Sequence, residues 1–221
     1  AVERSEDGVV VTLSDGRKVA GTHCLVAIGS IPNTEGLGLD AAGVEVSDSG
    51  HVVVDGVSRT CVNNIYAAGD CTGVYPLASV AAMQGRIAMA HILGDAVKPL
   101  RTDRVAGNIF TTPEIATVGV SEKDIEEGLY RGDTVMLSLT TNPRAKMMAV
   151  SDGFVKVFAR KHSGTVIGGV VVGPRASELI FPISLAVEKK LTVDDLAETF
   201  TVYPSLSGSV SEAARKLHTR G

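Results

Sequence analysis

The segment from Thr60 to Asp70 constrains the fold of this chain more than any other. Its sequence, TCVNNIYAAGD, predicts a short buried strand over 65–68 that ends in Gly-Asp. In open α/β sheets, ligands bind outside the carboxyl ends of the strands. A carboxylate at that position, Asp70, would accept hydrogen bonds from sugar-type hydroxyls, and Gly69 would let a ligand approach the backbone closely because it has no Cβ. The segment therefore predicts an α/β fold with a cofactor site at Asp70.

A helix rich in small residues is expected directly after this segment, over 77–93, with Gly94 ending it. The small residues recur at helical spacing, at Ala78, Ala81, Ala82, Gly85 and Ala88. Such a face would let the helix pack very close to a flat ligand. Ordinary close packing against a sheet is the alternative explanation of the same pattern. The free N–H groups and positive dipole end of the helix would suit an anion or an electron-rich ring edge.

The composition argues against several classes of partner. The chain has 221 residues, of which 44% are hydrophobic and 21% charged, as in a globular protein with a real core. A net charge of −4, 4% aromatic residues and no Trp argue against nucleic acid and against an anionic membrane surface. No apolar run is long enough to span a membrane. Three cysteines without regular spacing predict free, buried thiols in a reducing, cytoplasmic compartment.

Apolar periodicity and turn residues predict the remaining elements. In the first half, these are a hairpin over 9–20, a buried strand over 24–28, a short helix over 37–42 and a hairpin over 44–54. The charged connector 99–104 is expected to be a domain boundary. Beyond it, an α+β module is expected, with strands at 115–120, 134–139, 154–160 and 165–172, and helices opening at Ser121, Ser177, Thr192 and Ser207.

Five segments together resemble the flavoprotein disulfide reductase family, which includes dihydrolipoamide dehydrogenase and glutathione reductase. Each segment alone is a weak signal, whereas five in the family's order are a specific one. They are the end of the nicotinamide domain (VAIGSIPN, 26–33), the second flavin motif (60–70), the pair beside the flavin ring (Leu77-Ala78), and two interface motifs (FTTPEIATVG, 110–119, and GGVVVGPRASE, 168–178).

The resemblance implies an α/β flavoprotein with FAD and NAD(P)H as cofactors. Asp70 would bind the ribityl chain of FAD beside Gly69, the backbone of Leu77 and Ala78 would lie at the flavin ring, and Gly29 would line the nicotinamide side. The family's G-x-G-x-x-G fingerprint and redox cysteine pair lie upstream of these motifs. We therefore expect the C-terminal part of a protein with two dinucleotide-binding domains.

The resemblance also implies a division into three parts. Residues 1–30 would end the NAD(P)-binding domain, 31–101 would be the C-terminal part of the FAD-binding domain, and 102–221 would be an α+β dimerisation domain. The enzyme would be a homodimer, because the C-terminal motif of the family works only across the dimer.

That C-terminal motif, H-x-H-P-T-x-S-E, is altered in this chain to TVYPSLSG over 201–208. Tyr203 replaces the His that serves as acid and base, and Gly208 replaces the Glu that orients it. A phenol with a pKa near 10 donates a hydrogen bond at neutral pH but is a poor base. We therefore expect electrons to pass from NAD(P)H through FAD to a quinone-like acceptor, as in quinone-reducing relatives of dihydrolipoamide dehydrogenase. Tyr203 would face the partner's flavin and is the candidate catalytic residue.

Two other readings of the function stay open. A disulfide reductase such as dihydrolipoamide dehydrogenase would carry its redox cysteines upstream, and a catalytically degenerate dimeric scaffold would bind no FAD. Scattered histidines predict no metal site, and Cys71 is expected to pack rather than react. The basic loop 142–147 is expected to be a solvated turn, although it would also suit the route to the active site. No nucleophile elbow surrounds Ser205 and Ser207.

Overall fold

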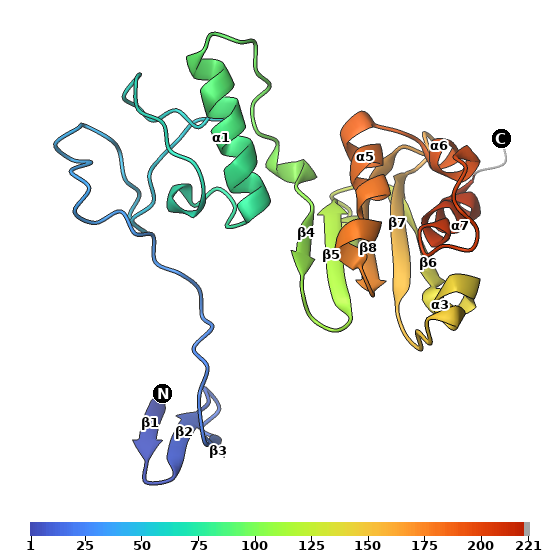
Figure 1. Ribbon diagram of the computed structural model, residues 1–221, viewed down its shortest axis with the longest axis horizontal. Helices are drawn as coiled ribbons and strands as arrows, with labels where there is room; N and C mark the ends of the chain where they lie inside the picture. Colours follow the sequence, from blue (N-terminus) through green and yellow to red (C-terminus); the bar gives the residue numbers. More distant parts are fainter. Residues whose placement is uncertain (219–221) are drawn as a thin grey trace.

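The second half of the chain is built around a five-stranded antiparallel sheet (Figure 1). The computed structural model describes residues 1–218. The strand order across the sheet is β4-β5-β8-β7-β6. The strands are β4 (Gly107–Ile109), β5 (Glu114–Gly119), β6 (Gly132–Ser138), β7 (Phe154–Arg160) and β8 (Val166–Gly173). The sheet, together with the helices that cover it, confirms the predicted mixed α/β architecture.

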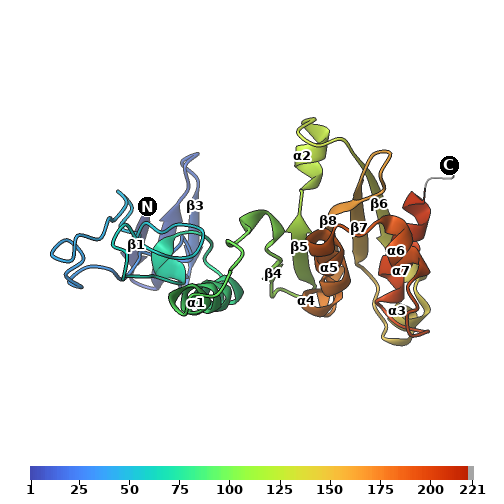
Figure 2. The same cartoon turned by 90° about the horizontal axis from the view of Figure 1, so that it is seen from above.

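Helices pack on the sheet and close its core. α5 contacts β5 and β8, whereas α7 contacts β6 and β7, and Figure 2 shows these helices along one side of the sheet. Val155, Val157, Val171 and Ile183 are completely buried between them, and each such side chain stabilises the fold by about 1.5–3 kcal/mol. The helices are α2 (Glu122–Glu126), α3 (Pro143–Met147), α4 (Ala176–Leu179), α5 (Phe181–Lys189), α6 (Val193–Glu198) and α7 (Gly208–Leu217).

The expected helix starts at Ser121 and Thr192 are confirmed by two capping boxes. At the second, the Thr192 hydroxyl accepts the Asp195 N–H at 3.2 Å, and the Asp195 carboxylate accepts the Thr192 N–H at 2.7 Å. The Thr192 N–H and hydroxyl together lower the pKa of Asp195. Ser121 and Asp124 make the same reciprocal pair at the start of α2.

The helix expected to open at Ser177 is divided in the structure into two helices, α4 and α5. Pro182 lies in the first turn of α5. A proline has no N–H to donate, and its ring would clash with the carbonyl four residues earlier. One continuous helix through Pro182 is therefore unfavourable, and a new helix starts there instead.

Glu114 joins the start of β5 to the start of α4. Its carboxylate accepts the Ser177 N–H at 2.9 Å and the Ser177 hydroxyl at 2.7 Å. These bonds, the N–H first, hold the pKa of Glu114 below its usual value of 4.5. A lowered pKa in the folded state adds stability above the unfolded-state pKa, and this contribution is lost as the pH falls through the folded-state pKa.

We therefore expect Glu114→Gln to make the protein less stable at pH 6 and less sensitive to acid than the parent protein. The amide still accepts a hydrogen bond but does not titrate, so the contribution that depends on pH disappears. Urea unfolding at pH 6 and at successive pH values below 4.5 measures the effect. Parallel stability curves for the two proteins over that range would contradict the assignment.

The first half of the chain contains fewer regular elements. β1 (Val2–Ser5), β2 (Gly8–Thr12) and β3 (Lys18–Gly21) form a small antiparallel sheet that includes the expected hairpin. α1 (Ala78–Ile92) is the long helix predicted from the small-residue pattern. The described residues also form three short 3-10 helices: η1 (Asp70–Thr72), η2 (Thr102–Arg104) in the connector, and η3 (Leu139–Thr141) in the second half.

Three predicted elements in this half are wrong. Residues 24–28 form no strand and are exposed, and residues 65–68 form only an isolated bridge between Tyr66 and Arg59. Residues 37–42 form turns in place of a helix. A strand needs a neighbour to pair its N–H and C=O groups. Within residues 1–218 the run 24–28 pairs with no strand, and the run 65–68 pairs only through the single bridge to Arg59. The hairpin over 44–54 is reduced to one bridge, from Val46 to Val52.

Candidate functional site

Asp70 lies at a tight turn directly before α1. Gly69 has a φ of +93°, which favours glycine, and a Cβ there would lie 3.4 Å from the Cβ of Ala81 on α1. Gly69 is buried, whereas Asp70 is exposed and opens η1. Its carboxylate makes no hydrogen bond or ion pair with any other described residue, so it is free to accept hydrogen bonds from a ligand.

A buried glutamine holds this turn against α1. The Gln84 Oε1 accepts the Gly69 N–H at 2.8 Å, and the Gln84 Nε2 donates to the Thr72 hydroxyl at 3.2 Å. Thr72 in turn donates to the Gly69 carbonyl at 2.8 Å. Gln84 is 1% exposed and Thr72 is 8% exposed. The closed triangle fixes the backbone that carries Asp70. Gln84 was not among the predicted site residues, although a polar residue among the apolar and small residues of α1 is a signal for it.

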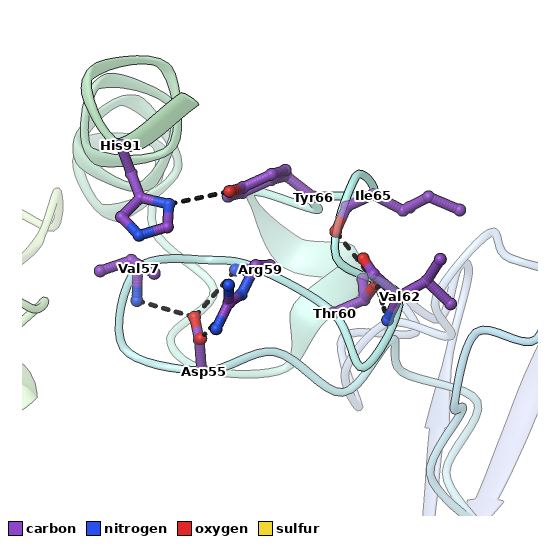
Figure 3. Close-up of polar contacts among 8 residues, drawn as sticks. All are labelled: Asp55, Val57, Arg59, Thr60, Val62, Ile65, Tyr66 and His91. Atoms are coloured by element: carbon purple, nitrogen blue, oxygen red, sulfur yellow. Dashed lines mark hydrogen bonds and ion pairs between the residues drawn. The ribbon is translucent and has the colours of Figure 1, made fainter. Parts of the chain in front are cut away.

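The segment that leads to Asp70 is fixed by its own side chains (Figure 3). The Asp55 carboxylate accepts two backbone N–H groups of its turn, at 3.0 and 2.9 Å. The Thr60 hydroxyl lies 3.0 Å from the Ile65 carbonyl oxygen and donates to it. Figure 3 shows Tyr66 and His91 pointing toward one another, with 2.8 Å between the phenol oxygen and the His91 Nδ1. The segment is therefore bound to α1 at two places, His91 and Gln84.

The N-terminus of α1 has free hydrogen-bond donors. Leu77 is the N-cap residue, with an extended backbone and no side-chain cap. Its carbonyl accepts the N–H groups of Val80 and Ala81, both at 3.0 Å. Within the described part of the chain, the N–H groups of Ala78 and Ser79 have no acceptor. The free Asp70 carboxylate can accept hydrogen bonds, and the uncapped N-terminus of α1, eight positions later, can donate them. This combination suits a flavin with a polyol chain.

The structure does not bring Gly29 to this site. Residues 22–34 contain no helix or strand and form an extended link in Figure 1. Gly29 is exposed there, with a φ of +112°. Its role on the nicotinamide side therefore stays a prediction, as does the division of the chain at residues 30 and 101.

Tyr203 and Gly208 border a second site, at the opposite end of the sequence. Tyr203 is 82% exposed and lies in the segment that leads into α7. Both residues line a cavity of about 340 Å³, here called the Tyr203 cavity. Its other lining residues are Leu137, Thr141, Asn142, Pro143, Thr201, Ser205, Ser209, Glu212 and Lys216.

The basic loop 142–147 borders this cavity and is not the solvated turn that was expected. It forms α3, and Asn142 Nδ2 donates to the Ser205 carbonyl at 2.9 Å and to the Ser209 hydroxyl at 2.8 Å. These contacts join residues more than sixty positions apart, so local sequence reasoning could not find them. The loop, Tyr203 and Gly208 therefore belong to one site.

The cysteines and histidines show no further site. Cys24 and Cys61 are exposed and Cys71 is half-buried, so the expectation of buried thiols is wrong for the first two, which lie in surface segments without regular structure. Among residues 1–218, no group of three His, Cys, Asp or Glu side chains is placed to hold a metal ion. None of the described helices combines the length and apolarity needed to cross a membrane.

Comparison with known proteins defines the class. Residues 1–85 match the family described as pyridine nucleotide-disulphide oxidoreductase, and residues 105–214 match its dimerisation domain. The chain belongs to this family of oxidoreductases, whose members use FAD and NAD(P)H.

Individual relatives differ in the acceptor that their names give. The chain is 57% identical over 217 residues to an "NAD(P)H dehydrogenase (quinone)" of Mycobacterium tuberculosis, and this match covers 98% of the chain and 44% of the relative. It is 38% identical over 218 residues to a dihydrolipoyl dehydrogenase of Bacillus subtilis, covering 96% of the chain and 46% of that protein. The chain thus spans less than half the length of both relatives.

Solved structures of two proteins also match nearly the whole of this chain. The crystal structure of LpdA from Mycobacterium tuberculosis superposes with a TM-score of 0.94 at 57% identity, over 99% of this chain and 48% of that one. The flavoprotein disulfide reductase RclA from Escherichia coli superposes with a TM-score of 0.89 at 26% identity, over 98% of this chain and 50% of that one.

Proposed function

We propose that this chain belongs to a homodimeric, FAD-dependent enzyme that passes two electrons from NAD(P)H to a quinone-like acceptor. The observation that carries the proposal is the pair Tyr203 and Gly208, which stand where the family's motif has its base and the carboxylate that orients it. Thiol–disulfide exchange needs such a base. Identity of 57% to a protein named NAD(P)H dehydrogenase (quinone) supports the same acceptor class.

The proposed reaction needs no acid–base pair. NAD(P)H supplies a hydride, which is two electrons and one proton, and solution supplies the second proton. In sum, NAD(P)H, one proton and a quinone give NAD(P)⁺ and a hydroquinone. Bound FAD would supply the two-electron redox chemistry that links NAD(P)H to the acceptor. The Tyr203 hydroxyl would donate a hydrogen bond to an acceptor oxygen as negative charge develops on it.

The residues around α1 would hold the flavin. Asp70 would accept hydrogen bonds from the ribityl hydroxyls, with Gly69 leaving room for close approach. The free N–H groups at Ala78 and at the following residue would face the electron-rich edge of the ring. The match to the family's dimerisation domain supports a homodimer. In that homodimer Tyr203 would face the partner's flavin. The free cysteines support a reducing, cytoplasmic location.

An acceptor screen tests the proposal. The purified full-length protein is expected to show the visible spectrum of bound flavin and to oxidise NAD(P)H with menadione, but not with lipoamide or glutathione disulfide. Turnover of lipoamide without turnover of menadione would favour the second candidate, a dihydrolipoyl dehydrogenase, as in the Bacillus subtilis relative. A colourless protein that takes up no FAD would favour a dimeric scaffold.

A further inference from the structure

A second cavity lies where the connector meets one end of the five-stranded sheet. It has a volume of about 590 Å³ and is here called the Arg160 cavity. Its walls come from η2, the end of β5, the end of β7, the start of β8 and the end of α5. Arg160 is the last residue of β7, whereas Leu137 of the Tyr203 cavity pairs with Val155 near the first. The Arg160 cavity and the Tyr203 cavity therefore lie at opposite ends of β7.

Four cationic side chains line the Arg160 cavity, and two of them already have anionic partners. The four are Arg101, Arg104, Arg160 and Lys190. Arg101 donates to both carboxylate oxygens of Asp103, with its Nε at 2.9 Å and its Nη2 at 2.7 Å. Arg104 donates through its Nη1 to the Glu188 carboxylate and to the Glu188 carbonyl, both at 3.1 Å. These two ion pairs fix the connector beside α5 and neutralise their own charges.

The other two cations, Arg160 and Lys190, have no anionic partner. Both are exposed, and neither side chain makes a hydrogen bond or ion pair with another of the residues 1–218. The remaining carboxylate of the cavity, Asp124, is engaged elsewhere, because its Oδ2 accepts the Ser121 N–H at 2.9 Å and the Ser121 hydroxyl at 2.7 Å. With Glu188 counted among the carboxylates, the cavity still carries one positive charge in excess, although the whole chain has a net charge of −4.

The neutral part of the wall offers one free hydroxyl and an apolar surface. The Tyr130 hydroxyl bonds to no other described residue, and Tyr130 is 40% exposed. Ile167 and Val187, both buried, supply apolar surface beside the cations. A volume of about 590 Å³ lies within the usual range of small-molecule sites, about 300–1,000 Å³. The cavity therefore has room for an organic group next to an anion.

We propose that the Arg160 cavity binds a small phosphate monoester. The planar guanidinium of Arg160 matches two phosphate oxygens at once, and the Lys190 ammonium supplies the second positive charge that a phosphate dianion needs. A carboxylate would use only one of these two charges. The Tyr130 hydroxyl would donate to a phosphate oxygen, while the organic group would lie against Ile167 and Val187. This site goes beyond the proposed function and does not depend on it.

Calorimetric titration of the full-length, FAD-loaded protein with phenyl phosphate and with inorganic phosphate tests the inference. Phenyl phosphate is expected to bind more tightly than inorganic phosphate, because its ring adds apolar contact. Arg160→Gln should raise the Kd for phenyl phosphate about tenfold, since it removes a charge-assisted hydrogen-bonded pair. Lys190→Gln should raise it about threefold, as expected for an exposed ion pair. Lys189→Gln is the matched control, because Lys189 is also exposed at the end of α5 but does not line the cavity, and it should leave the Kd unchanged.

Three results would overturn the inference. The first is that neither compound binds to the unmodified protein. The second is an unchanged Kd for phenyl phosphate in a folded Arg160→Gln protein, because the compound would then bind at another place, such as a dinucleotide site. The third is inorganic phosphate binding as tightly as phenyl phosphate, which would exclude an ester as the ligand. If Arg160→Gln does not fold, the comparison of Lys190→Gln with Lys189→Gln decides, and equal Kd values for these two would overturn the inference. Turnover of menadione is measured separately, so each of these results leaves the proposed function standing.

Discussion

Asp70→Ala is expected to weaken FAD binding by the full-length protein about ten- to hundredfold. A hydrogen bond to a charged group contributes about 1.5–3 kcal/mol, which corresponds to that range of affinity. Because Asp70 is exposed and has no partner among the described residues, its removal should leave the fold intact. Titration of the stripped protein with FAD, followed by flavin fluorescence, measures the change.

Asp48→Ala is the matched control for this experiment. Asp48 is also an exposed carboxylate in a turn of the first half of the chain, and its removal should leave FAD affinity unchanged. Equal FAD affinity in the Asp70→Ala protein and the parent would contradict the flavin assignment of this turn.

Gln84→Leu is expected to lower the free energy of unfolding by about 2 kcal/mol, because a buried donor without a partner costs about 1–3 kcal/mol. The change leaves the buried Gly69 N–H without an acceptor and removes the group that donates to the Thr72 hydroxyl. FAD affinity should fall as well, since the turn that carries Asp70 is no longer fixed to α1. Urea unfolding and FAD titration of the same protein measure the two effects.

Arg86→Leu provides the comparison for the glutamine variant. Arg86 lies two residues later on α1 and is exposed. A substitution at an exposed position usually changes stability by less than about 0.5 kcal/mol. If Gln84→Leu were no more destabilising than Arg86→Leu, the hydrogen-bonded triangle would not be what holds the turn.

Local signals predicted the second half of the chain well. The strands β5, β7 and β8 form where apolar runs meet turn residues, and both capping boxes follow from residue types three positions apart. The strand β4 escaped prediction because it has only three residues, Gly, Asn and Ile, two of them poor strand formers. The errors in the first half have a different cause: an apolar run such as 24–28 becomes a strand only beside another strand.

The two candidate sites were predictable to different degrees. The motif match located Asp70, Leu77 and Ala78, and the structure places them at the turn and the N-terminus of one helix. The same match located Tyr203 and Gly208 but gave no cavity, because the contacts of Asn142 with the segment before α7 depend on the tertiary fold.

The geometry at Gly208 has a consequence for how specificity is encoded in this fold. The nearest atoms to a Cβ there are at ordinary van der Waals distance, so the main chain would tolerate an acidic side chain without rearrangement. The main chain at position 208 therefore does not by itself require glycine. If the proposed function holds, a change of electron acceptor at this position would need a new side chain and no new main-chain conformation.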